Sequence, residues 1–280
     1  MKRIHLLPNV ITAFGLSCGL FVIFKMTMLD VAEVDFQVLT AIAGILLLAA
    51  FADLLDGAVA RAMKAQSDFG GLFDSMTDAV TFGVGPSVIV LKSIPLASGT
   101  ELSFLLTTAA MVFSVCGVLR LVRFNLMAQK AKADPNLEDA NNKNFTGMPI
   151  PAGAAAAVSA NLFLISPEFR YFFTISETSR ALIMIFAMIV LGYFMISRWK
   201  FPSLKNLHIR VASFQVVFVT VVTAALLFYG LLHHFAVVFF CCSWAYLGIA
   251  GVLSLIRLIS GRKSKTLEDF EPDHDEIDIE

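Results

Sequence analysis

Long apolar runs dominate this sequence and restrict what the chain can fold into. Of its 280 residues, 58% are hydrophobic and 15% are charged, and the mean hydropathy is +0.78. A run of about 17 to 25 apolar residues is long enough to cross a bilayer as a helix. We therefore predict an all-α polytopic membrane protein with about eight transmembrane helices, near residues 9–29, 37–60, 71–96, 102–126, 149–166, 180–197, 213–232 and 235–257.

The basic residues indicate how these helices are oriented. Loops rich in Lys and Arg stay on the cytoplasmic side of a membrane. With the N-terminus inside, only four of the 21 Lys and Arg residues fall on the other side, namely Lys25, Lys92, Arg170 and Arg180. We therefore expect both termini to face the cytoplasm, as in a bacterial inner-membrane protein. The net charge is -1 and no basic block is present, so we expect contacts with membrane lipid and none with nucleic acid.

Four aspartates interrupt the apolar runs between residues 53 and 78. Asp53 and Asp56 occupy neighbouring positions on one helical face, and Asp74 and Asp78 stand one turn apart on the next helix. The connection between these helices is short and polar, so they should be antiparallel neighbours with both aspartate pairs near their cytoplasmic ends. One ionised side chain at the bilayer centre costs roughly 2.5 to 3.5 kcal/mol, so four unpaired ones would cost on the order of 10 kcal/mol. Divalent metal is the first candidate for neutralising them.

The ligand chemistry of this cluster points to a hard cation. Carboxylate oxygens without a nearby His or Cys favour Mg²⁺ or Mn²⁺ over zinc. Two such ions would balance four carboxylates and would stabilise both the attacking and the leaving oxygen of a phosphoryl transfer. Arg61 could then bind a diphosphate through its guanidinium fork. The alternative is that the aspartates pair with basic residues or serve a metal-coupled transporter with an acidic core.

The aspartates belong to a longer spaced pattern. It reads Asp53-x-x-Asp56-Gly57-x-x-Ala60-Arg61 and, after eight more residues, Gly70-x-x-x-Asp74-x-x-x-Asp78. This pattern resembles the signature of the CDP-alcohol phosphatidyltransferase family, and every position is filled. The resemblance implies a six-helix membrane core, a CDP-linked lipid donor, two metal ions on the four aspartates, and catalytic roles for Asp74 and Asp78, the latter as general base. It also implies a nucleotide site formed by Gly57, Ala60, Arg61, Ser67 and Gly70.

Other segments bear on the acceptor alcohol. They are 79–86, 120–125, 145–152 and 195–205, and together they resemble the integral-membrane phosphatidylserine synthases of that family. This resemblance implies CDP-diacylglycerol and L-serine as substrates. Arg120 or Arg123 could grip the serine carboxylate, and Asn125 could hydrogen-bond serine or brace an arginine. The alternative role for the arginines is to anchor their helix at lipid phosphates. The alternative acceptors are choline and glycerol 3-phosphate.

Two further segments are expected beside the site. Asn9 and Thr12 belong to a Pro-Asn-x-x-Thr sequence that resembles segments near the cytidine in relatives, so they are candidate nucleotide contacts. The alternative is that Asn9 caps the first helix and that Thr12 is a residue tolerated near a helix start. Residues 145–151 contain Gly147 and two prolines, which oppose a regular helix, and they form either a flap at the active site or an ordinary helix start.

The organisation of the whole chain follows from these assignments. We expect residues 1–211 to form the catalytic core of six helices and residues 212–260 to add two more. Residues 261–280 are acidic and should form a disordered cytoplasmic tail. Many relatives are homodimers, so the resemblance also implies a homodimer. His233 and His234 fall on the far side of the membrane from the aspartates, which makes them poor catalytic candidates.

Overall fold

The computed structural model describes residues 6–63, 67–97, 99–133, 145–197, 200–201 and 229–260. Nearly all of this part is helical. The helices are α1 (Leu6–Met28), α2 (Phe36–Ala62), α3 (Asp68–Asp78), α4 (Gly85–Ser93), α5 (Glu101–Ala133), α7 (Ile150–Ile165), α8 (Pro167–Phe172), α9 (Glu177–Ile196) and α11 (Phe235–Ser260), with short turns η2 (Val31–Glu33) and η3 (Ala79–Val84). Two strands of two residues each, β1 (Phe145–Thr146) and β2 (Lys200–Phe201), pair antiparallel. The predicted all-α class is confirmed.

Several of these helices can cross a membrane. By length and hydropathy they are α1, α2, α5, α9 and residues 235–252 of α11. Helix α7 is apolar but shorter, and α3, η3 and α4 follow one another without a break from Asp68 to Ser93. These seven segments match seven of the eight predicted spans. The predicted span at 213–232 and the tail at 261–280 lie largely or wholly outside the described residues, so the count of eight stays a prediction.

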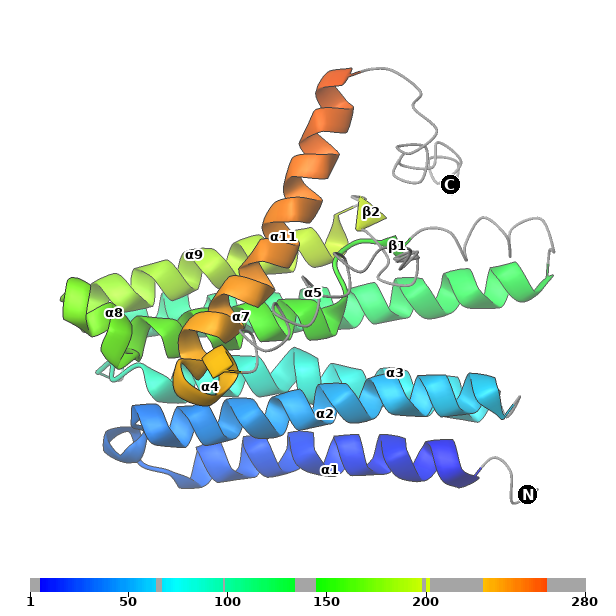
Figure 1. Ribbon diagram of the computed structural model, residues 1–280, viewed down its shortest axis with the longest axis horizontal. Coiled ribbons are helices and arrows are strands. Elements are labelled where there is room, and N and C mark those ends of the chain that lie inside the picture. Colours follow the sequence, from blue (N-terminus) through cyan, green and yellow to red (C-terminus); the bar gives the residue numbers. More distant parts are fainter. Residues whose placement is uncertain are drawn as a thin grey trace, which may run out of the picture.

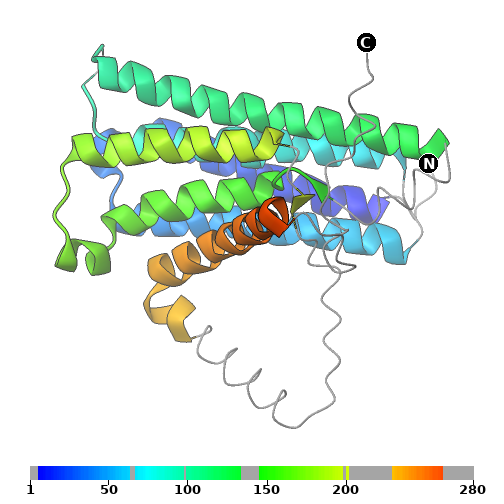
Figure 2. The same ribbon diagram turned by 90° about the horizontal axis from the view of Figure 1, so that it is seen from above.

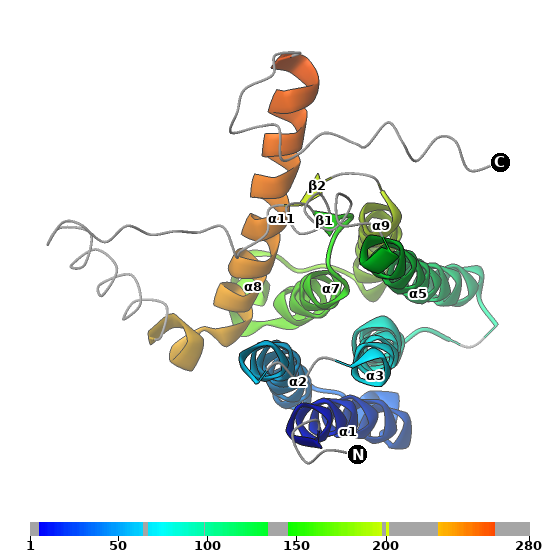
Figure 3. The ribbon, with the colours of Figure 1, turned by 90° about the vertical axis from the view of Figure 1, so that its right-hand side faces the viewer.

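Helices α1, α2, α5, α7 and α9 and the continuous segment from α3 to α4 lie side by side as a bundle, and α7 occupies its middle (Figures 1 and 3). Most residues of α7 are buried, and many of them are alanines. Small side chains let neighbouring helices approach closely in a membrane. Gly153 of α7 illustrates this, because a Cβ there would collide with the side chain of Met195 in α9. The bundle therefore depends on small residues along its central helix.

Helix α11 does not run along the bundle but crosses it obliquely over α7, and its second half extends away (Figures 1 and 3). Trp244 joins α11 to α7, because its Nε1 donates a hydrogen bond to the Ala156 carbonyl at 3.2 Å. The rings of Phe163 and Phe240 stack with centroids 4.4 Å apart. At the start of α11, His234 lies 2.9 Å from Glu168 of α8.

The two ends of the bundle differ in what they carry. One end has the N-terminus, the end of α2, the start of α3 and the end of α5, whereas the other end has α8 and the start of α5 (Figure 1). Lys25, Lys92, Arg170 and Arg180 all belong to helix ends on this second side. Lys92 donates to the carbonyls of Thr27 and Leu29, each at 3.3 Å. The four basic residues thus gather at one end, as the predicted topology requires.

A π-helical turn, η3, follows directly after Asp78. The amide of Gly85 donates to the Val80 carbonyl, five residues back, instead of four. Pro86 has no N–H with which to continue the regular ladder. Such wide turns often occur at functional sites. Here the turn lies against α1, where a Cβ on Gly19 would collide with Thr81.

Candidate active site

Three of the four aspartates meet between α2 and α3. One carboxylate oxygen from each of Asp53, Asp56 and Asp74 lies within 4.8 Å of the other two. Asp56 is only 5% exposed, and the other two are partly buried. The antiparallel arrangement of α2 and α3 brings their aspartate-bearing faces together, as the helical spacing predicted.

Asp78 lies one turn further along and outside that group of three. Its carboxylate interacts electrostatically with Asp53 and Asp74, which repel it, and with Arg120 of α5, which attracts it. Arg120 is itself buried, at 8% exposure. Asp78 therefore connects the acidic cluster to a buried guanidinium.

The donor set fits divalent metal. Asp74 Oδ1 and Asp78 Oδ1 are buried, and no described residue donates a hydrogen bond to either. A buried carboxylate oxygen without a partner is costly, and mutual repulsion within the cluster adds to that cost. A hard cation would satisfy these oxygens, and a set made only of oxygen suits Mg²⁺ or Mn²⁺.

Thr12 of α1 supports this cluster directly. Its hydroxyl donates to Asp56 Oδ2 at 2.5 Å and also lies 3.1 Å from the Pro8 carbonyl. Helix α1 begins at Leu6, so Asn9 and Thr12 lie within the helix. The alternative that Asn9 caps the helix start is therefore wrong. Thr12 orients an aspartate, which the sequence did not predict.

The predicted nucleotide residues fall into two groups near the ends of α2 and α3. Arg61 folds back over Gly57, since a Cβ on that glycine would lie 3.3 Å from Arg61 Nη1. Ala60 lies in the same last turns of α2 and is partly buried. In the second group, a Cβ on Gly70 would lie 3.1 Å from Ser67 Oγ and 3.3 Å from Asn9 Oδ1.

Ser67 has a structural role at this point. Its hydroxyl accepts a hydrogen bond from the Gly70 amide at 3.0 Å and so caps α3. The cap fixes the start of the helix that carries Asp74 and Asp78. Asn9, Ser67 and Gly70 thus form one corner between α1 and α3, and nucleotide contact for all these residues stays a prediction.

The three residues predicted to bind serine do not form one cluster. Arg120 is buried and interacts electrostatically with Asp78, whereas Arg123 donates to the Ile196 carbonyl at 3.0 Å and to the Ser197 carbonyl at 3.4 Å. A cation at these carbonyls complements the end of α9. Asn125 Oδ1 accepts a hydrogen bond from Ser75 of α3 at 3.1 Å. Arg120 thus interacts with Asp78 itself, and Asn125 bonds the neighbour of Asp74.

The segment around Gly147 is non-helical up to the start of α7. Gly147 has φ = +83°, a conformation that glycine adopts readily, and the Met148 amide donates to the Phe194 carbonyl at 3.1 Å. A Cβ on Gly147 would lie 2.9 Å from Arg123 Nη2 and 2.5 Å from the Met195 carbonyl. The segment therefore packs on Arg123 and the end of α9 and leads into α7 at Ile150, and a role as a flap at the active site stays a prediction.

Comparison with known proteins now identifies the family. The sequence profile of the CDP-alcohol phosphatidyltransferase family matches residues 5–195, a stretch that contains all four aspartates. The chain belongs to this family. It is therefore a phosphatidyltransferase, and the comparisons give no support to a transporter.

Curated relatives in bacteria and archaea cover most of the chain. The CDP-diacylglycerol--serine O-phosphatidyltransferase of Bacillus subtilis is 30% identical over 71% of this chain and 92% of its own length. The protein of that name in Helicobacter pylori (strain 26695) is 28% identical over 78% of this chain and 81% of its own. The protein of that name in Methanocaldococcus jannaschii is 31% identical over 64% of this chain and 73% of its own length.

Two threonines of this phosphatidyltransferase were missed in the sequence. Thr77 and Thr81 line a cavity of about 10 Å³ with Thr12 and the three clustered aspartates. Their hydroxyls are buried, and no described residue bonds to them. About one water molecule fits such a volume. The sequence spacing could have identified them, because Thr77 and Thr81 follow Asp74 by three and seven residues and so share its helical face.

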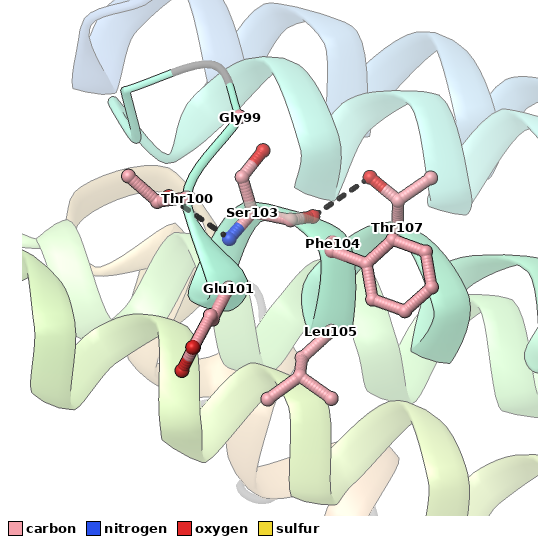
Figure 4. Close-up of a pocket in the computed structure, with 7 residues that line it drawn as sticks. All are labelled: Gly99, Thr100, Glu101, Ser103, Phe104, Leu105 and Thr107. Carbon is pink, nitrogen blue, oxygen red and sulfur yellow. Dashed lines mark hydrogen bonds between the residues drawn. The ribbon is translucent and has the colours of Figure 1, made fainter.

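A wider hollow elsewhere in the phosphatidyltransferase lacks comparable chemistry. It is lined by residues 99–107, with Glu101 as its single ionisable group (Figure 4). These residues open α5 at the end of the bundle away from the aspartates. We therefore expect the reaction at the small acidic cavity and not at this hollow.

The Thr12 contact gives a testable expectation for metal use. Removing the hydroxyl in Thr12→Val should raise the Mn²⁺ concentration needed for half-maximal activity by roughly 10 to 100 times, as for other residues that brace metal ligands. Thr12→Ser, which keeps the hydroxyl, should restore the normal requirement. Titration of CMP release with Mn²⁺ measures this effect, and an unchanged requirement in Thr12→Val would show that Thr12 does not orient Asp56.

Proposed function

We propose that this enzyme transfers the phosphatidyl group of CDP-diacylglycerol to the hydroxyl of L-serine, which yields phosphatidylserine and CMP. The observation that carries the proposal is the acidic cluster, together with the buried guanidinium of Arg120 within electrostatic range of Asp78. It places a site suited to a diphosphate beside a buried cation that can bind a carboxylate. The relatives named above carry serine and CDP-diacylglycerol in their names.

The donor would bind at the aspartate end of the bundle with its acyl chains in the bilayer. Two divalent ions, Mg²⁺ or Mn²⁺, held by Asp53, Asp56, Asp74 and Asp78, would polarise the diphosphate and stabilise the leaving oxygen. Arg61 at the end of α2 is exposed and would pair with a diphosphate oxygen. The cytidine would lie near the corner formed by Asn9, Ser67 and Gly70.

Residues of α3 and α5 would bind and deprotonate the acceptor serine. Arg120 would hold the serine carboxylate, which directs the serine hydroxyl towards Asp78. The unpartnered Oδ1 of Asp78 would take the hydroxyl proton. The serine oxygen forms a bond to the phosphorus on the lipid side, the bond from this phosphorus to the CMP oxygen breaks, and CMP leaves with that electron pair. A single displacement needs no further nucleophile.

The setting of this reaction is also part of the proposal. The protein is an integral membrane protein, and we place the aspartate end and both termini in the cytoplasm of a bacterial inner membrane, where serine is available. Residues 1–211 would form the catalytic core, and the helices within 212–260 would support assembly as a homodimer. The basis is the charge distribution and the family resemblance.

The acceptor can be tested directly with purified protein. CMP release from CDP-diacylglycerol in the presence of Mg²⁺ or Mn²⁺ should require L-serine, and should be absent with choline, glycerol 3-phosphate or inositol phosphate. Mass spectrometry of the lipid product should show phosphatidylserine. Release with choline or glycerol 3-phosphate but not with serine would reject serine while keeping the transferase, and no release with any alcohol would reject both.

A further inference from the structure

A second polar site lies at the other end of the bundle, where α8 links α7 and α9 (Figures 1 and 2). It is a pocket of about 160 Å³. Its apolar wall includes Leu164 and Ile165, and its polar lining is Arg170, Thr174, Glu177 and Arg180. The volume is roughly ten times the 10 to 15 Å³ that one water molecule needs. The pocket is therefore large enough for a small anionic group.

Arg180 is held rigidly in this pocket. It is only 4% exposed, and its Nη2 donates to Asn161 Oδ1 at 2.8 Å. Asn161 in turn donates to Ser93 Oγ at 2.8 Å, which ties the guanidinium to α4 and α7. The Nε of Arg180 is buried and has no acceptor among the described residues. The Nε–H of the Arg180 guanidinium is therefore a hydrogen-bond donor without an acceptor, in a side chain whose position is already fixed.

The pocket also carries more positive than negative charge. Glu177 lies 3.3 Å from Arg180 Nη1, and it is the carboxylate among the lining residues. Arg170 adds a second guanidinium, whose charge repels that of Arg180. Glu168, on the same short helix, is not among the lining residues. Its Oε1 bonds His234, which lowers the pKa of Glu168, and its Oε2 is buried without a partner among the described residues. Among the residues that line the pocket, two arginines therefore stand against one carboxylate, that of Glu177.

The surroundings of the pocket place it at a lipid surface. Tyr171, Phe172 and Phe173 follow Arg170 directly and are 84%, 74% and 61% exposed. Aromatic residues at the end of a membrane bundle are typical of the lipid headgroup region. Basic residues are scarce at this end, with four expected in the whole chain, yet two of them converge here.

We propose that this pocket binds a phosphate group through Arg170 and Arg180, in the leaflet opposite the aspartates. Guanidinium groups match phosphate oxygens in charge and geometry. A phospholipid headgroup is the source that the adjoining aromatic side chains favour, because acyl chains would cover Phe172 and Phe173. The bound phosphate would join α8 to α9 and supply the acceptor that Arg180 Nε lacks. This site is independent of the transfer reaction at the other end of the bundle.

The test uses the full chain, purified in detergent and stripped of lipid, and three probes. They are phosphatidylglycerol, diacylglycerol without phosphate, and inorganic phosphate, and the readouts are bound lipid by native mass spectrometry and the thermal unfolding midpoint. Arg170→Gln is the main variant, since Arg170 is exposed and anchors no described helix. Lys25→Gln is the matched control, because it removes one exposed positive charge at the same end outside the pocket. Arg180→Lys serves as a second variant that keeps the charge but lacks Nε.

Phosphatidylglycerol should stabilise the unmodified protein and Lys25→Gln equally, and should bind about tenfold more weakly to Arg170→Gln and Arg180→Lys. Binding at the active site cannot mimic this result, because neither substitution touches the aspartates. The same pattern with inorganic phosphate alone would identify free phosphate as the source. Equal responses of all four proteins, or equal stabilisation by diacylglycerol, would overturn the proposal.

Discussion

Replacing Asp74 by Asn should lower serine-dependent CMP release by roughly 10² to 10⁴ times. Asp74 is the residue through which α3 joins Asp53 and Asp56 of α2, and its buried Oδ1 has no donor among the described residues. Asparagine preserves the shape but removes the charge that a divalent cation requires. The measurement is the rate of CMP formation at saturating CDP-diacylglycerol and serine.

A matched control makes that result specific. Asp30→Asn has the same chemistry, lies at the opposite end of the bundle before η2, and should leave the rate unchanged because Asn caps a helix as well as Asp. Asp74→Asn should also keep its detergent-extracted fold, seen as a single species in size-exclusion chromatography. Near-normal CMP release by folded Asp74→Asn would remove the acidic cluster from the reaction.

Helical spacing was sufficient to predict most of this cluster. Asp53 and Asp56 follow one another by three residues and Asp74 and Asp78 by four, so local geometry alone sets which faces they occupy. The short polar connection between α2 and α3 then leaves few arrangements for the two helices. These are local rules, and for that reason the sequence predicted the convergence well.

Contacts between distant segments could not be predicted in this way. The hydroxyl of Thr12 reaches Asp56 across 44 positions of sequence, because α1 packs against α2. Arg123 finds the Ile196 carbonyl 73 positions away, because α9 ends beside α5. Both partners depend on where helices end in space, and residue spacing carries no information about that.

Hydropathy likewise predicted α11 but not its direction. The apolar residues 235–257 indicate a helix long enough to cross a membrane, and the structure has a helix from Phe235 to Ser260. The length of an apolar run does not determine tilt, which comes from packing against neighbours. Here Trp244 and Phe240 set the oblique crossing over α7.

Arg120 and Arg123 should respond differently to the same substitution. Arg120→Gln should lower kcat/KM for serine at least about 100-fold, because it removes a buried cation that faces Asp78 and can pair with a carboxylate. Arg123→Gln should instead reduce stability by about 1 to 3 kcal/mol, since two carbonyls at the end of α9 lose charged donors. Each variant is thus the control for the other, and the measurements are serine kinetics and thermal unfolding.

The two arginines differ by three positions on one helix, so surface charge and membrane topology change equally in both variants. A general electrostatic effect would therefore lower serine use to the same extent in each. Separate effects require that the guanidinium groups act in different places, Arg120 at the acidic site and Arg123 under Gly147. If Arg123→Gln lost serine use at normal stability while Arg120→Gln kept it, the carboxylate of serine would have to bind beside Arg123 at the end of α9, and Arg120 would have no part in the serine site.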